Sequence, residues 1–169
     1  MKKIILLALF AFSPLAASAT EPPAAQSPLL GITLFFEADG ALAKETANIP
    51  RDKLVENEMK SSMDRLAAGS ATLEPVLAKS VKLETVFLGA DRIAYLNFNE
   101  NFVADHPGGI TQEIITLAGV CQTVFSNFDV DGIRLLAKGK EIKSVAGHVD
   151  IESAISRAQC DRFLQYRKE

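Results

Sequence analysis

The segment from Val81 to Val149 constrains the fold of this 169-residue chain more than any other. Two short runs of strand character are joined by a turn at residues 89–92, which predicts an antiparallel hairpin. A glycine-containing break at residues 106–109 follows, and apolar residues then recur at helical spacing over 110–127. Residues 130–137 are typical of a last long strand, which turns into a short return. The segment therefore predicts hairpin, helix and strand in that order.

The N-terminal half adds a strand and a helix. Residues 29–38 are rich in β-branched and aromatic residues, and Asp39-Gly40 is a turn signal. We expect residues 41–50 to form a loop with a short edge strand. A helix is expected over 51–68 and should end at Gly69, because glycine adopts the left-handed conformation of a helix end without a Cβ clash. Its expected core-facing stripe is Val55, Met59, Met63 and Leu66.

These elements predict the fold class α+β. The expected order is β-α-β-β-α-β, with one twisted, mostly antiparallel sheet and two helices on one face. A C-terminal helix over residues 153–169 is expected to pack on this small single domain, since so short a helix is marginal in water by itself.

Six segments of the chain share a pattern with one known family: Leu66-Ala67-Ala68-Gly69, Val81 to Val86, Ala94 to Phe98, Gly109 to Val124, Gly139, and Gly147-His148-Val149-Asp150. In residue types, order and spacing these segments resemble the GerMN domain of sporulation and spore germination. The resemblance covers Leu30 to Ile151 and departs from the family at Gly69-Ser70, where Gly-Pro is usual, and at Cys121-Gln122.

The resemblance implies a GerMN-like domain over residues 29–152 and a noncatalytic interaction or structural role in the cell envelope. The implied partner is an envelope protein or a peptidoglycan-associated protein, and self-association stays open. The alternative is a small periplasmic ligand-binding protein or hydrolase that uses the loops around His106 and His148. The first class predicts a flat or helix-lined partner surface. The second predicts a pocket where both histidines meet a carboxylate.

The first residues indicate export. A short positive start, an apolar run and Ala17-Ser18-Ala19 are typical of a signal peptide over residues 1–19, followed by a flexible leader over 20–28. We expect transport across the inner membrane to the periplasm or the cell-wall side, without a stable membrane span. Cleavage leaves 16 basic and 21 acidic residues, a net charge of −5, which disfavours nucleic acid as a partner.

Cys121 and Cys160 are the only cysteines. In an oxidising compartment an even number of cysteines favours a disulfide, and two free buried thiols are the alternative. A nucleophilic Cys121 is disfavoured because it lies on an apolar stripe with no neighbouring base in the sequence. The disulfide is therefore expected to attach the C-terminal helix to the helix over 110–127.

The sequence predicts no catalytic residue, metal site or cofactor. His106 and His148 are isolated from each other, whereas metal sites usually need three or four ligands at paired spacing. His106, Gly108 and Gly109 form a candidate anion or ligand loop before a helix, although no phosphate-loop lysine follows. The glycines are better explained by the sharp turn there. Asp129 and Asp131 are interpreted as turn residues rather than calcium ligands.

Overall fold

The chain is seen in a computed structural model that describes residues 28–165, so the expected signal peptide and most of the leader lie outside the described residues. Its first elements are strands β1 (Leu29–Ala38) and β2 (Ala41–Pro50), paired antiparallel along their whole length. Asp39 and Gly40 both have positive φ, 48° and 80°, as a two-residue hairpin turn requires. The expectation of a loop with a short edge strand over 41–50 was wrong, because the tight turn brings all ten residues into register with β1.

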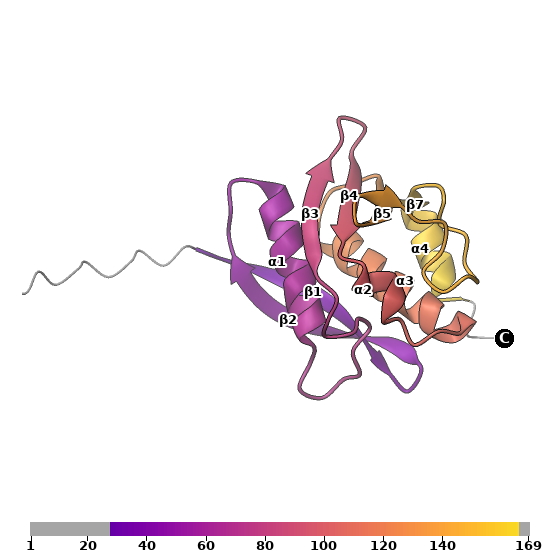
Figure 1. Cartoon of the computed structure of the whole chain (residues 1–169). Coiled ribbons are helices and arrows are strands. Elements are labelled where there is room, and N and C mark those ends of the chain that lie inside the picture. The colour runs from indigo at the N-terminus through magenta and orange to yellow at the C-terminus, as the bar shows by residue number, and fades with distance from the viewer. Residues whose placement is uncertain (1–27, 166–169) are drawn as a thin grey trace, which may run out of the picture.

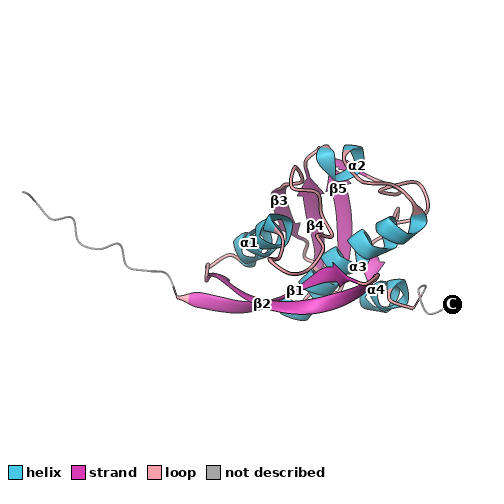
Figure 2. Ribbon diagram, turned by 90° about the horizontal axis from the view of Figure 1, so that it is seen from below, coloured by secondary structure: helices cyan, strands magenta, loops and turns pink. Residues whose placement is uncertain are grey.

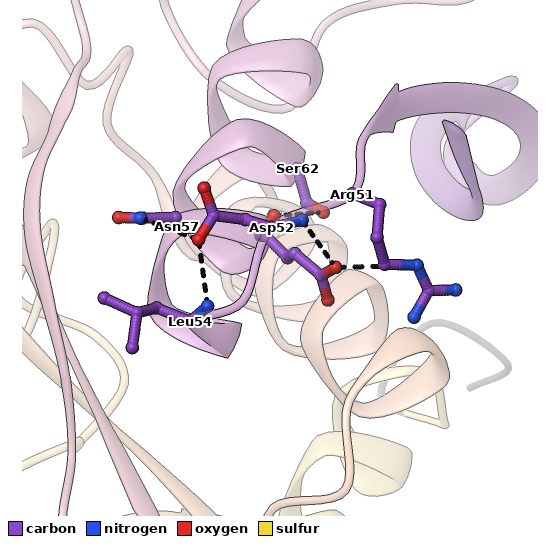
Figure 3. A network of polar contacts seen from close by, with 6 residues as sticks. Arg51, Asp52, Leu54, Asn57 and Ser62 are labelled. Atoms are coloured by element: carbon purple, nitrogen blue, oxygen red, sulfur yellow. Dashed lines mark hydrogen bonds and ion pairs between the residues drawn. The ribbon is translucent and has the colours of Figure 1, made fainter. Parts of the chain in front are cut away.

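Helix α1 (Val55–Ala68) starts four residues later than expected. Figure 3 shows why: Asp52 Oδ1 accepts hydrogen bonds from the Leu54 N–H at 2.9 Å and from Asn57 Nδ2 at 3.1 Å, which holds Asp52 outside the helix. The Leu54 and Asn57 bonds also lower the pKa of Asp52. The Asp52 N–H donates to Glu58 Oε1 at 3.0 Å. The predicted end at Gly69 is confirmed, with φ 84°.

The second sheet carries the hairpin and strand that the sequence predicted. Its order is β3 (Leu83–Leu88), β4 (Ile93–Phe98), β5 (Gly132–Ala137) and β6 (Lys140–Glu141), and β7 (Ile155–Ser156) also pairs with β5. The β4–β5 pair is parallel and the other pairs are antiparallel. A parallel pair needs a crossover connection, which here contains helix α3 (Ile110–Asn127). Because only one of the strand pairs is parallel, the prediction of a mostly antiparallel sheet is confirmed.

A bulge changes the faces of β3. The register shifts between Leu83 and Thr85, so Leu83 is buried while Phe87 is 64% exposed beside Tyr95. The alternation of residue types in the sequence predicts that Val81, Leu83, Thr85 and Phe87 share one face of this strand. That prediction was wrong, because an extra residue in a bulge moves the following side chains to the other face.

Helices α2 (Asn101–Ala104) and α3 (Ile110–Asn127) connect β4 to β5, and α3 has the predicted bounds. Almost every residue from Glu113 to Phe125 is buried, so α3 is the centre of the core rather than an amphipathic surface helix. Gly119 allows the connector after α1 to approach closely: a Cβ on this residue would lie 2.8 Å from a methyl group of Val76. Figures 1 and 2 show α1 and α3 beside the second sheet, with the β1–β2 hairpin running along both helices.

The β1–β2 hairpin is joined to the rest of the domain by side chains of α3 and by one backbone bridge. The amide of Asn127 accepts from the Thr33 N–H at 2.8 Å and donates to the Thr33 carbonyl at 2.7 Å, and Thr123 Oγ1 accepts from the Phe35 N–H at 3.3 Å. Glu37 forms an isolated bridge with Glu74. The first strand therefore lies in its own two-stranded sheet, and the expectation of one continuous sheet was wrong in this respect.

The C-terminal helix is shorter than expected. Helix α4 spans Arg157–Phe163, and Ser156 caps it by accepting from the Gln159 N–H at 3.2 Å. Ile155 falls within the helix expected over residues 153–169 but is buried in strand β7 instead, and residues 166–169 lie outside the described part. None of the helices described over residues 28–165 has both the length and the apolar character needed to cross a membrane.

Candidate functional site

The His106 loop lies between α2 and α3. His106 Nδ1 accepts from the Gly108 N–H at 3.0 Å, and Nε2 lies 3.2 Å from Thr116 Oγ1. Because the Thr116 hydroxyl already donates to the Val76 carbonyl at 2.9 Å, it accepts from Nε2–H. Both ring nitrogens of His106 are therefore engaged in the neutral tautomer that carries its proton on Nε2.

The electrostatics of His106 agree with this assignment. Burial lowers the pKa of His106, and the smaller opposing effects of the Gln112 backbone and the Glu113 charge do not reverse this. The ring borders a cavity of about 280 Å³ whose lining is largely apolar and includes Val76 and Phe102. A neutral ring with two occupied nitrogens connects the loop, α3 and the connector after α1. It has no nitrogen left for proton transfer in this arrangement.

The candidate anion loop has fewer free donors than its sequence indicated. Gly108 and Gly109 have φ values of 83° and 80°, which supports the expected sharp turn. The Gly108 N–H donates to His106, and the Gly109 carbonyl accepts from the Glu113 N–H in the first turn of α3. The Glu113 carboxylate lies buried in the same turn, where its charge opposes a bound anion. Anion binding stays a prediction that these contacts disfavour.

The second histidine borders a different cavity. His148 lines a space of about 280 Å³ together with Ile110, Arg162 and Phe163, and this lining shares no residue with the His106 cavity. The His148 side chain is exposed, while its backbone N–H donates to Glu113 Oε2 at 2.9 Å. The described residues thus do not form the shared pocket that the hydrolase alternative required.

Glu113 is the residue whose role the sequence did not indicate. Its side chain is 0% exposed and accepts hydrogen bonds from five donors of the loop over residues 144–149. Oε1 accepts from Ser144 Oγ at 2.5 Å and from the N–H groups of Val145 and Ala146, both at 2.8 Å. Oε2 accepts from the N–H groups of His148, at 2.9 Å, and Val149, at 3.2 Å. Glu113 fixes a loop that has almost no regular structure.

The pKa of Glu113 is set by two opposing causes. Burial raises it, because an ionised carboxylate is poorly solvated there, but the hydrogen bonds from Ala146, Ser144, His148 and Val145 lower it more. The net pKa lies below the ordinary value, so the carboxylate is ionised at neutral pH. A carboxylate in this state is an acceptor only and cannot serve as a general acid. The observed contacts give Glu113 a structural role.

The cysteines and the paired aspartates are also engaged. Cys121 in α3 and Cys160 in α4 form a disulfide with a Cα–Cα distance of 6.0 Å, and both are buried. Arg92 binds Asp129 at 2.6 Å and Asp131 at 3.1 Å. Over residues 28–165 there is no group of three or more His, Cys, Asp or Glu side chains that could hold a metal ion.

Comparison with known protein structures finds the same fold in bacterial proteins. The first GerMN domain of the Bacillus subtilis sporulation protein GerM aligns with a TM-score of 0.63 at 18% identity, over 76% of this chain and 98% of that one. A structure with both tandem GerMN domains of GerM aligns with a TM-score of 0.64 at 17% identity, over 77% of this chain and 47% of that one.

A third similar structure is from Clostridium perfringens and is described as a candidate lipoprotein. It aligns with a TM-score of 0.55 at 22% identity, over 77% of this chain and 89% of that chain. No curated protein sequence matches. A family model named Germane, described as sporulation and spore germination, matches residues 33–143, which include the last part of β1, all of β2, α1, the hairpin of the second sheet, α3 and β5. The chain therefore belongs to the Germane family, whose domains are called GerMN.

Proposed function

We propose that this protein is a noncatalytic interaction module of the bacterial cell envelope, exported across the inner membrane. The family match over residues 33–143 is the observation that carries the proposal. The signal-peptide pattern over residues 1–19 supports export, and so does a buried pair of cysteines that are joined to each other, because disulfides persist in oxidising compartments.

The contacts of the histidines support the noncatalytic part. Both nitrogens of His106 are bound within the protein, and His148 lies at another cavity. A general base must reach the proton it removes, and a nucleophile must lie beside such a base. The ordered, hydrogen-bonded loops around the start of α3 form a fixed surface instead, which suits the recognition of an envelope protein or a peptidoglycan-associated protein.

Fractionation and mass spectrometry test the export step. The protein should be found in the envelope fraction with Thr20 as its first residue and with Cys121 and Cys160 in one disulfide-linked peptide pair. An intact Lys2-Lys3 terminus with two free thiols would overturn export.

Crosslinking in intact cells, followed by purification and mass spectrometry, tests the interaction step. A partner that acts in the envelope should be enriched, and His148→Ala should leave the purified protein as inert as the wild type toward peptidoglycan fragments and small esters. A hydrolytic activity that disappears in folded His148→Ala or His106→Ala protein would overturn the noncatalytic assignment.

A further inference from the structure

One edge of the β1–β2 hairpin is open over its full length. The N–H groups of Thr33, Phe35 and Glu37 point away from β2, since they bond to Asn127, Thr123 and Glu74. Ladder bonds to β2 therefore come from the even-numbered residues of β1, which lie opposite odd-numbered residues of β2. The even-numbered residues of β2 direct their backbone groups to the outer edge. Four of them carry an N–H group that no other described residue accepts from, namely Leu42, Lys44, Thr46 and Asn48.

The other strand edges among the described residues are protected. The outer edge of β1 is closed by α3 side chains and by Glu74. The edge strand β3 has six residues and a bulge beside the charged residue Glu84, and β6 and β7 have two residues each. Short length, bulges and charges are the devices that keep edge strands from pairing with other chains. The ten-residue β2 has no bulge, and its proline is at its last position.

We propose that β2 pairs with β2 of a second copy of this chain, antiparallel and across a two-fold axis at Thr46. This inference goes beyond the role as an envelope module and does not depend on it. Main-chain hydrogen bonding between two open edges is the recognition mode called β-augmentation. Thr46 is exposed, as are Lys44 and Asn48 on either side of it, so the middle of the strand is accessible.

Symmetry and charge select this register. A two-fold axis perpendicular to a sheet keeps each side chain on its own face, and neighbouring residues point to opposite faces. The axis must therefore lie midway between one residue and the same residue of the second copy. An axis at Lys44 or at Glu45 places like charges directly opposite each other, which is destabilising. An axis at Thr46 places Lys44 opposite Asn48 of the second copy and Glu45 opposite Ala47. An axis at Ala47 also avoids like-charge pairs but pairs only residues 44–50, whereas the axis at Thr46 pairs residues 42–50, which is nearly the whole strand.

Disulfide crosslinking tests the register. In a hydrogen-bonded antiparallel pair the two Thr46 Cα atoms would lie about 5.5 Å apart, within the range that a disulfide spans. The two Lys44 Cα atoms would lie four residues apart along the strands, at about 14 Å. Under mild oxidation Thr46→Cys should form a covalent dimer on non-reducing gels, and the matched variant Lys44→Cys should not. No dimer with Thr46→Cys, or equal dimer with both variants, would overturn the proposal.

Sedimentation analysis of the native chain over a concentration series tests the pairing itself. The wild type should move from monomer to dimer as its concentration rises. Thr46→Pro removes an outward N–H and keeps the ladder with β1, so it should stay monomeric with an unchanged circular dichroism spectrum. Thr46→Ala keeps the N–H and should dimerise like the wild type. A wild type that is monomeric throughout, or folded Thr46→Pro protein that still dimerises, would contradict the proposal.

Charge changes give a graded version of the same test. Asn48→Glu places an anion opposite Lys44 twice per dimer and should tighten the dimer about 2- to 30-fold, whereas Asn48→Lys should weaken it by a similar factor. Shifts in the same direction for both variants, or none, would exclude the Thr46-centred register. If the wild type stays monomeric while Thr46→Pro abolishes capture of a different envelope protein, the second-copy assignment is wrong and β2 binds a foreign strand.

Discussion

Replacing Glu113 by glutamine should destabilise the domain, because one buried carboxylate accepts all five hydrogen bonds from the loop over 144–149. An amide can direct its oxygen at Ser144 Oγ and the N–H groups of Val145 and Ala146, but its NH₂ group then faces the N–H groups of the next two donors. Two donors without an acceptor would cost about 2–6 kcal/mol if fully buried. Since both lie in part-buried bonds that water can reach, we expect a loss of about 2–4 kcal/mol.

The pH dependence should change together with the stability. The pKa of Glu113 in the folded protein lies below its value in the unfolded chain, so its contribution is complete above the unfolded pKa and is lost as pH falls through the folded value. The wild type should therefore lose stability in acid below about pH 4.3, the ordinary pKa of glutamate. Glu113→Gln should lack this part of the acid loss.

Urea unfolding between pH 3 and pH 7 measures both effects. Glu56→Gln is the matched control, since Glu56 also lies in the first turn of a helix but accepts no hydrogen bond from a distant loop among residues 28–165. Loss of the helix-dipole interaction alone should cost it no more than about 1 kcal/mol. If the two variants lost equal stability, or if Glu113→Gln kept the acid dependence of the wild type, the loop-fixing role of Glu113 would be refuted.

Three further predictions use the same unfolding assay. Removing the disulfide with reductant, or with the double change Cys121→Ser and Cys160→Ser, should lower the free energy of unfolding by about 4 kcal/mol, because the bridge closes a long loop. The reductant should have no effect on the double variant. His106→Gln should lose the part of the pH dependence of stability that His106 supplies. The folded pKa of His106 is lowered, so the stability of the wild type falls as pH drops below about 6.5. An unchanged slope of stability against pH in this range would contradict a neutral ring. Gly119→Ala should cost about 1–3 kcal/mol by overpacking against Val76, and a neutral result would show that the connector can move away.

The sequence predicted elements whose signals are local. The bounds of α3 were correct because a glycine break and a continuous apolar repeat define both ends, and Gly69 marked the end of α1 for a similar reason. The full length of strand β2, of which only a short edge strand was expected, was missed because its alanine, threonine and asparagine residues carry little strand character of their own. Its partner β1 and the Asp39-Gly40 turn decide its conformation. A bulge that turns Phe87 outward leaves no mark in an alternating pattern.

The candidate site was predicted less completely than the fold. His106 and the glycines were correctly located at a loop before a helix, but the partner of His106 on α3 depends on how the loop folds back. The function of Glu113 depends mainly on backbone donors 32 to 36 residues away. Backbone N–H groups are present in every residue except proline, so no residue type in the loop identifies them as partners. The position of Glu113 in a first helical turn indicated only a favourable dipole interaction.

The closure of the β1 edge by α3 has a consequence for the order of folding. Thr33 and Asn127 are 94 residues apart in sequence, whereas the hairpin itself is a local structure that forms within about 1–10 µs. A newly made or newly translocated chain therefore has a hairpin with two open edges until α3 has formed and docked. Open edges of transient intermediates are templates for aggregation. The polar residues at the end of α3 thus limit the time during which the β1 edge of the hairpin can recruit other chains, and leave only the β2 edge open in the folded domain.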